Sequence, residues 1–227
     1  MAGLEEAVCA ATDALLDGRS HIKLLEAGCG SATHIRFRPE VYAVGIDISK
    51  KQLDKNATVQ EKILGDIQEH SLPKGEFDVV ICWNVLEHLS KPKDALLNLF
   101  NSVKPEGLVI LGFPNLLSIK GIATKVTPFW FHELFYRFMK SDFRPFPTYL
   151  RRAILPKNVT RFAEENGFFV EFFSLVEGGV AKRVRNRFVV LDVAFSMVDS
   201  MAKAITFGKM PSPLLDTCAI ILKKRGD

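Results

Sequence analysis

Short apolar runs alternate with helix-like segments through the first half of the chain. Five runs rich in Val, Ile and Leu lie at 21–27, 41–47, 61–66, 77–83 and 107–113. Each is apolar almost throughout, which is typical of parallel strands with helices on both faces. Helix signals stand between them at 49–59, where Ser49 suits an N-cap, and at 92–103, where Pro92 opens the segment. This alternation predicts an α/β fold, a doubly wound and mostly parallel sheet.

After Pro114 the alternation of strand-like and helix-like segments stops, and it returns later in the chain. Residues 115–152 are dense in aromatic residues and Arg and are broken by prolines, which predicts an inserted helical cap. Beyond it, 156–166 has a helical pattern, while 168–176 and 216–224 read as strands, giving seven strands in all. A further amphipathic helix is expected at 5–16. We therefore predict a core of residues 1–114 and 153–227, with the cap at 115–152.

An apolar stripe runs from Val184 towards the C-terminus. Its members recur at steps of four, three, four and three: Val184, Phe188, Leu191, Phe195 and Val198. This spacing predicts an amphipathic helix. Packing of the stripe on the domain's own core is the favoured interpretation, ahead of binding to a membrane or a partner.

Composition and cysteine usage indicate a reduced, cytoplasmic globular protein. The chain has 227 residues, of which 48% are hydrophobic and 25% charged. No run reaches the roughly 18 apolar residues of a membrane span, and the acidic N-terminus does not resemble a secretory signal. The four cysteines show no paired spacing, so neither disulfides nor a metal site is expected.

Charge is spread unevenly along the chain. The net charge is +4, but residues 137–187 hold 11 Lys and Arg against 5 Asp and Glu, a local +6. Such a region suits an anionic ligand, a membrane surface or simply a solvated face. It lacks a nucleic-acid-binding module, so no nucleic-acid partner is expected.

The stretch LLEAGCGSATH ends the first apolar run on a carboxylate and two glycines. Ligands of open parallel sheets bind beyond the carboxyl ends of the strands. Gly28 and Gly30 would let a ligand approach the backbone, and Glu26 could bind an ammonium group. Asp47, 19 residues after Gly28, suits the hydroxyls of a ribose.

A further strand end extends this pattern towards an adenosine. Asp66 ends the third run, where it could accept from an adenine amine, with Ile48 and Ile67 on the two faces of the ring. Nicotinamide dinucleotides also contain adenosine, but their fingerprint has a third glycine where this chain has Thr33. S-adenosylmethionine, which has an ammonium group and no pyrophosphate, fits better.

With these motifs the chain resembles the class I S-adenosylmethionine-dependent methyltransferases, of the small-molecule, methyltransferase type 11-like kind. LLEAGCGSATH, VGIDIS, LGDI, FDVVICWNVLEHL and KPEGLVILGFPN carry the resemblance. It implies a Rossmann-like methyltransferase fold and S-adenosyl-L-methionine as cofactor, with S-adenosyl-L-homocysteine as product. The residues implied at the cofactor are Glu26, Gly28, Cys29, Gly30, Asp47, Ile48, Asp66, Ile67, Trp83 and Asn84. Ala32 and the short segment 31–40 depart from the family's pattern.

The expected reaction moves a methyl group to an oxygen or nitrogen of a small-molecule acceptor. His88 and His132 are candidate bases, each weighed against a packing role, whereas Glu87 is interpreted as structural. Trp130, Tyr149 and Arg144 of the cap are candidate substrate-binding residues. The turn after the fourth run reads CWNVLEHL, unlike the Asn/Asp-Pro-Pro-aromatic turn of adenine-N6 and glutamine-amide methyltransferases.

Two alternatives keep the fold but change the function. A lipid-linked or membrane-proximal acceptor would use the basic region and the striped helix. A non-catalytic scaffold subunit would have no affinity for S-adenosylmethionine.

Overall fold

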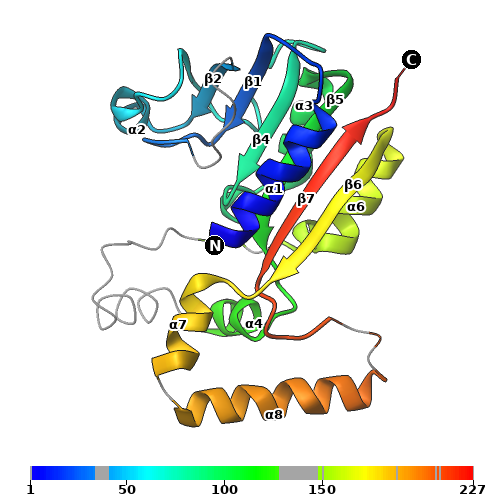
Figure 1. Ribbon diagram of the computed structural model, residues 1–227. Coiled ribbons are helices and arrows are strands. Elements are labelled where there is room, and N and C mark those ends of the chain that lie inside the picture. Colours follow the sequence, from blue (N-terminus) through cyan, green and yellow to red (C-terminus); the bar gives the residue numbers. More distant parts are fainter. Residues whose placement is uncertain are drawn as a thin grey trace.

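A seven-stranded sheet forms the centre of the computed structural model, with helices on both sides (Figure 1). The structure describes residues 2–33, 41–127, 148–149, 151–187, 189–207, 209 and 211–226. The strands are β1 (Ile22–Ala27), β2 (Val41–Asp47), β3 (Glu61–Leu64), β4 (Phe77–Trp83), β5 (Val103–Pro114), β6 (Phe168–Val176) and β7 (Thr217–Lys224).

The strand order is β3-β2-β1-β4-β5-β7-β6. The first five strands in this order are mutually parallel, and β7 runs antiparallel to both of its neighbours. This confirms the predicted α/β, doubly wound and mostly parallel sheet. From β1 the chain continues to one side, and from β4 to the other. The switch point therefore lies beyond the carboxyl ends of β1 and β4, where open α/β sheets bind ligands.

Helices complete the layers. They are α1 (Ala2–Leu15), α2 (Lys50–Lys55), α3 (Pro92–Ser102), α4 (Ile119–Val126), α6 (Pro156–Glu165), α7 (Gly179–Arg187) and α8 (Val189–Ile205), with single 3₁₀ turns η1 (Leu86–His88) and η2 (Arg152–Ile154). In Figure 1, α1 covers one face of the sheet, and α3 and α6 cover the other. Within the described residues, no helix combines the length and the apolar character needed to span a bilayer.

Both faces of the central strands are buried, as their continuous apolar pattern predicts. On β4, Val79 and Ile81 pack in one cluster with Val8 of α1. Val80 and Cys82, which point the opposite way, pack in the cluster that includes residues of α3 and α6. Side chains alternate between the two faces of a strand, so a strand covered on both sides has no position for a polar residue in its interior.

Some predicted elements differ from the observed ones. The helix expected at 49–59 ends at Lys55, because Asn56 leaves the helix and turns its side chain towards the loop after β1. The strand expected at 107–113 already begins at Val103. The striped helix is two helices, α7 and α8, and the side chain of Val198 is 44% exposed rather than packed on the core.

Most of the predicted cap lies outside the described residues. Within 115–152, the structure describes α4 with its flanking residues, Asn115 to Thr127, and then short pieces near Tyr149 and η2. The predicted domain boundaries at 114 and 153 therefore stay a proposal.

Candidate cofactor and acceptor site

The carboxyl ends of three parallel strands bring the predicted cofactor residues to one edge of the sheet. Ala27 of β1 is in register with Ile46 of β2 and with Cys82 of β4. The residues that follow each strand therefore meet at the switch point. The loop after β1, the end of β2 and the turn after β4 form a single site there.

The loop after β1 depends on two glycines, for different reasons. Gly28 and Gly30 have φ of +71° and +53°, the left-handed region that favours glycine. A Cβ on Gly28 would overlap the side chain of Val85, whereas a Cβ on Gly30 would meet nothing within 4 Å. The space beside Gly28 is thus filled by the protein itself, and only Gly30 leaves open space for a ligand. This corrects the expectation that both glycines make room for one.

Replacing Gly28 with Ala is expected to destabilise the fold by about 2–4 kcal/mol, because the left-handed backbone is strained and the new methyl group overlaps Val85. Gly30→Ala is the matched control, since it carries only the backbone strain of about 1–2 kcal/mol. Urea unfolding of both variants measures the difference. Combining Gly28→Ala with Val85→Ala should bring the cost of the glycine substitution down to that of the control. Equal costs for the two single variants would contradict the overlap.

Asp47 joins the glycine loop to the start of α2. Its Oδ2 accepts a hydrogen bond from the backbone N–H of Gly30 at 2.9 Å, and its Oδ1 accepts one from the N–H of Ser49 at 2.7 Å. Ser49 caps α2 as predicted, accepting from the N–H of Gln52. A carboxylate oxygen has two lone pairs, so each oxygen of Asp47 retains one acceptor position for a hydroxyl group.

Asn56 holds the glycine loop from the other side, a role that sequence reasoning missed. Its side chain is buried, and its Nδ2 donates to the carbonyl oxygens of Cys29 and Gly30 at 3.3 and 3.2 Å. Its Oδ1 accepts from Thr58 and Val59. An Asn at a helix end is a frequent C-cap, so the sequence contained no signal that it reaches a loop 26 residues away.

Glu26 and Cys29 are both buried, but they differ in how they could serve a ligand. Glu26 is a carboxylate at the end of β1 with 1% of its surface exposed, directly before the loop. The sulfur of Cys29 points into the sheet, because a Cβ on Gly45 of β2 would lie 2.6 Å from it. Burial, with the charges of Glu26 and Asp47, raises the pKa of the Cys29 thiol to about 12. Cys29 can therefore meet a ligand through its backbone only.

Hydrogen bonds of Asp66 and Gln68 hold the loop after β3. Asp66 accepts from the backbone N–H of Gln68 at 2.9 Å and from its side-chain Nε2 at 3.0 Å. The Oε1 of Gln68 accepts in turn from Ser90 and Lys91, so this loop is bound to the start of α3. Gln68 was not foreseen from the sequence.

The two isoleucines expected on either side of an adenine lie in different environments. Ile48 is 73% exposed at the edge of the site, whereas Ile67 is 4% exposed and belongs to the core on the α3 side. The side chain of Ile48 is available to a flat ring. Ile67 is available through its backbone.

At the end of β4, Asn84 and Trp83 also lie in different environments. Asn84 is exposed and has φ of +54°, a conformation uncommon outside glycine, and its N–H donates to Gly112 O at 2.8 Å. Such backbone strain is frequent at functional sites. The ring of Trp83 packs in the core against Gly112, where a Cβ would overlap it. The ring of Trp83 therefore faces the core, and a role of Trp83 at the cofactor stays a proposal.

The turn η1 brings a carboxyl group, an imidazole and a residue of the predicted cap together. Glu87 Oε1 lies 3.9 Å from His88 Nε2, and the carbonyl oxygen of Glu87 accepts from the N–H of Tyr149 at 2.9 Å. The side chain of His88 is 30% exposed and that of Tyr149 lies on the surface. The structure thus places His88 and Tyr149 beside the same turn, and the roles expected of them at the acceptor stay predictions.

Glu87 is the unusual member of this turn. It is 7% exposed, and among the described residues its Oε2 has no hydrogen-bond partner. Burial raises the pKa of Glu87 to about 7, against the opposing effects of its own backbone N–H and the charge of Lys120. A carboxyl group with this pKa exchanges a proton near neutrality.

Three predicted residues fall outside the described part of the chain: His132, Trp130 and Arg144. Their roles stay predictions.

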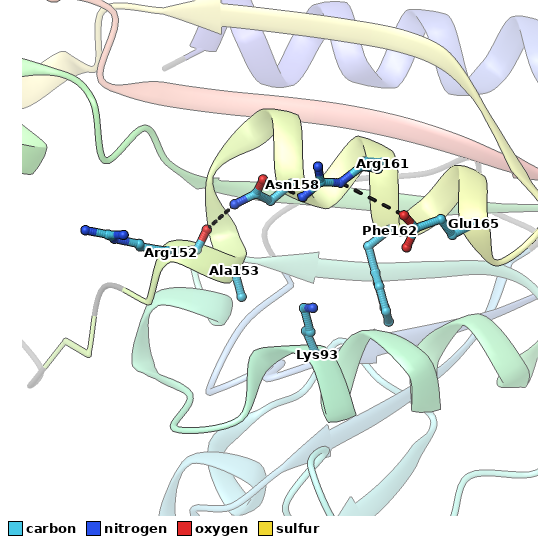
Figure 2. A pocket seen from close by; sticks show the side chains of 7 residues that line it. All are labelled: Lys93, Arg152, Ala153, Asn158, Arg161, Phe162 and Glu165. Carbon is cyan, nitrogen blue, oxygen red and sulfur yellow. Dashed lines mark hydrogen bonds and ion pairs between the residues drawn. The ribbon is translucent and has the colours of Figure 1, made fainter.

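A surface hollow of about 440 Å³ lies away from the predicted cofactor residues, between α3 and α6 (Figure 2). Two of its three cations have partners within the protein. Lys93 lies over the ring of Phe162, with 5.5 Å from Nζ to the centroid, and Arg161 is bound to Asn158 and Glu165. The side chain of Arg152 points away from the other labelled residues in Figure 2. This arrangement has no group directed at a ligand.

Comparisons with known proteins agree with this geometry. A family model described as "Methyltransferase domain" matches residues 2–146. The mitochondrial ubiquinone biosynthesis O-methyltransferase of Schizosaccharomyces pombe is 36% identical over 101 residues, or 39% of this chain and 36% of that protein. The matched segment thus spans little more than a third of the curated relative's length.

Solved structures show the same fold at low identity. The N-methyltransferase NodS from Bradyrhizobium japonicum, in complex with S-adenosyl-L-homocysteine, gives a TM-score of 0.52 at 12% identity, covering 96% of this chain and 86% of that chain. The [4+2]-cyclase SpnF gives 0.55 at 14% identity, covering 98% and 83%. One fold therefore accompanies more than one reaction among these proteins.

Proposed function

Because this chain belongs to the class I S-adenosylmethionine-dependent methyltransferases, we propose that it transfers a methyl group from S-adenosylmethionine to an oxygen of a small-molecule acceptor. One observation carries the proposal: an open glycine, two carboxylates and a strained asparagine converge where β1, β2 and β4 end. They are Gly30, Glu26, Asp47 and Asn84.

The residues at this edge fit the methyl donor. Gly30 faces open space, and Asp47 retains an acceptor position on each oxygen, which suits the two hydroxyls of a ribose. Glu26 supplies a negative charge beside the loop for the ammonium group. Asp66 and the exposed Ile48 are the candidates for the adenine. When bound, the donor supplies an electrophilic methyl group. The protein's own residues have to hold it, orient the acceptor and keep water out.

Oxygen is proposed as the methylated atom for two reasons. The curated relative at 36% identity is named an O-methyltransferase of ubiquinone biosynthesis. A hydroxyl group also has to lose its proton as the new bond forms, and the turn after β4 offers His88 beside Glu87 for that step. A phenol-type hydroxyl is the corresponding acceptor class.

Incubation with isotope-labelled S-adenosylmethionine and a panel of phenols tests the proposal. Label recovered in a methyl ether, together with S-adenosylhomocysteine, is the expected result. Label in an amine would move the acceptor atom to nitrogen. Binding of S-adenosylmethionine without transfer to any compound of a cell extract would favour a different reaction on the same fold, and no binding would favour a scaffold subunit.

Replacing His88 with Asn is expected to lower turnover by about 10²–10⁴-fold, because a positioned base contributes about that much. The affinity for S-adenosylmethionine, measured by calorimetry, should stay unchanged. His21→Asn is the matched control, since His21 is exposed at the opposite end of β1. Normal turnover in the His88 variant would make His88 a packing residue.

A further inference from the structure

The helix α8 turns an uninterrupted apolar face towards solvent. At 100° per residue, the members of this face lie within an arc of about 140° that contains no polar residue. They are Val193, Ala194, Met197, Val198, Met201, Ala204 and Ile205. All seven are exposed, with fractions of 64% for Met197, 62% for Met201 and 73% for Ile205. We call this set the α8 apolar face.

A helix that packs on its own domain turns its apolar side inward and its charged side to solvent. The orientation of α8 is the reverse. The charged residues of α8 lie on the other side, where Asp192 pairs with Arg185 of α7 and Asp199 pairs with Lys203. In Figure 1, α8 lies apart from the sheet, below α4 and α7. A contiguous exposed apolar surface of this kind marks an interaction site in most soluble proteins.

Cations stand at both ends of the α8 apolar face. Before α8, α7 has no acidic residue and exposes Lys182, Arg183 and Arg187. Within the described residues no carboxylate lies within ion-pair distance of these three, which we call the α7 cations. Beyond the other end of α8, Phe207 is 88% exposed and Lys209 is exposed. The segment 179–209 as a whole holds six Lys and Arg against two Asp.

This charge pattern argues against a second copy of the chain as the occupant. In a pair of α8 helices related by a two-fold axis across them, the helices run antiparallel, which would bring the α7 cations of each copy to Lys209 of the other. A parallel pair would face like ends with like ends. Both arrangements place cations of one copy against cations of the other, and this is unfavourable for association.

An anionic lipid bilayer matches both features of the surface. An interfacial helix buries its apolar side at the boundary between headgroups and acyl chains, while nearby Lys and Arg attract the anionic headgroups. We propose that this protein docks on an anionic membrane through the α8 apolar face, with the α7 cations and Lys209 at the headgroups. The helix α4 follows β5, and α7 follows β6. Both strands end on the side of the sheet where β1 and β4 also have their carboxyl ends. If the proposed methyltransferase function holds, docking there would bring the site close to an acceptor dissolved in the membrane.

Co-sedimentation with vesicles tests the docking surface without any methyl donor, so its result is independent of the proposed activity. The full chain should bind vesicles of phosphatidylcholine with phosphatidylglycerol, and less well vesicles of phosphatidylcholine alone. Met197→Glu with Met201→Glu should weaken binding by about 100-fold, because two apolar anchors are lost and two negative charges are added. Lys182→Gln with Arg183→Gln and Arg187→Gln should weaken binding and its dependence on salt.

The matched control is Ser196→Glu with Ser200→Glu, which adds the same charges to exposed positions outside the apolar arc. This variant should lose clearly less affinity than the methionine variant, and far-ultraviolet circular dichroism should show both folded. Equal losses in the two variants, or no binding of the unmodified chain, would overturn the proposal. So would a dimer in sedimentation velocity that the methionine substitutions dissociate, because the face would then be a contact between copies.

Discussion

Replacing Asp47 with Ala is expected to weaken S-adenosylmethionine binding about 100-fold. Hydrogen bonds to a charged group contribute about 1.5–3 kcal/mol each, and the substitution removes the carboxylate proposed for the ribose hydroxyls. It also removes the acceptor that fixes the N–H of Gly30, so the loop would lose part of its order. Isothermal titration calorimetry with S-adenosylmethionine measures the loss.

Asp54→Ala provides the control for this substitution. Asp54 lies on the exposed side of the adjacent α2, where among the described residues it pairs with Lys50 alone. Its replacement should leave the affinity unchanged. If Asp47→Ala lowers the unfolding midpoint yet binds the donor normally, the ribose role is refuted, and Asp47 serves only to join the loop to α2.

Replacing Glu87 with Gln is expected to stabilise the protein at pH 8 by roughly 3 kcal/mol. Burial raises the pKa of Glu87 from 4.5 to about 7, so between these values the folded protein keeps a proton that the unfolded chain releases. The free energy of unfolding therefore has its full value below about pH 4.5 and falls as the pH rises through 7. A difference of this size in pKa corresponds to roughly 3 kcal/mol. Glutamine stays neutral and avoids this loss.

Denaturant unfolding between pH 5 and 8, in steps of about half a unit, resolves this dependence. The unmodified chain should lose stability across this range, and the Gln variant should give a flatter curve. Glu69→Gln is the control, since Glu69 is exposed. Parallel curves for the unmodified and Glu87→Gln proteins would mean that water or a neighbouring cation compensates the buried carboxylate.

The strands and the acidic residues at their ends could be predicted from local sequence alone. A strand covered on both faces has to be apolar at consecutive positions, so β1, β2 and β4 were recognisable without any partner. The glycines and carboxylates that follow them were recognisable because a parallel sheet gathers the carboxyl ends of its strands at one edge. The same logic identified Ser49, since capping is decided within one helical turn.

Contacts between distant segments were beyond such reasoning. Val85 fills the space beside Gly28, and Asn56 supports the carbonyl of Gly30, across separations of 57 and 26 residues. No local periodicity encodes either contact. The burial of the Trp83 ring was not predictable for the same reason, because alternation along β4 does not say which face meets the ligand.

The sequence by itself determined the alternating architecture, the loop with its two glycines and the carboxylates at the strand ends, because these follow from periodicity and backbone preference over a few neighbouring residues. Only the tertiary structure decided that Glu87 is buried and that the apolar side of α8 faces outward. Burial depends on which surfaces the whole chain covers, and a stripe of apolar residues is the same in sequence whether a core, a partner or a membrane receives it.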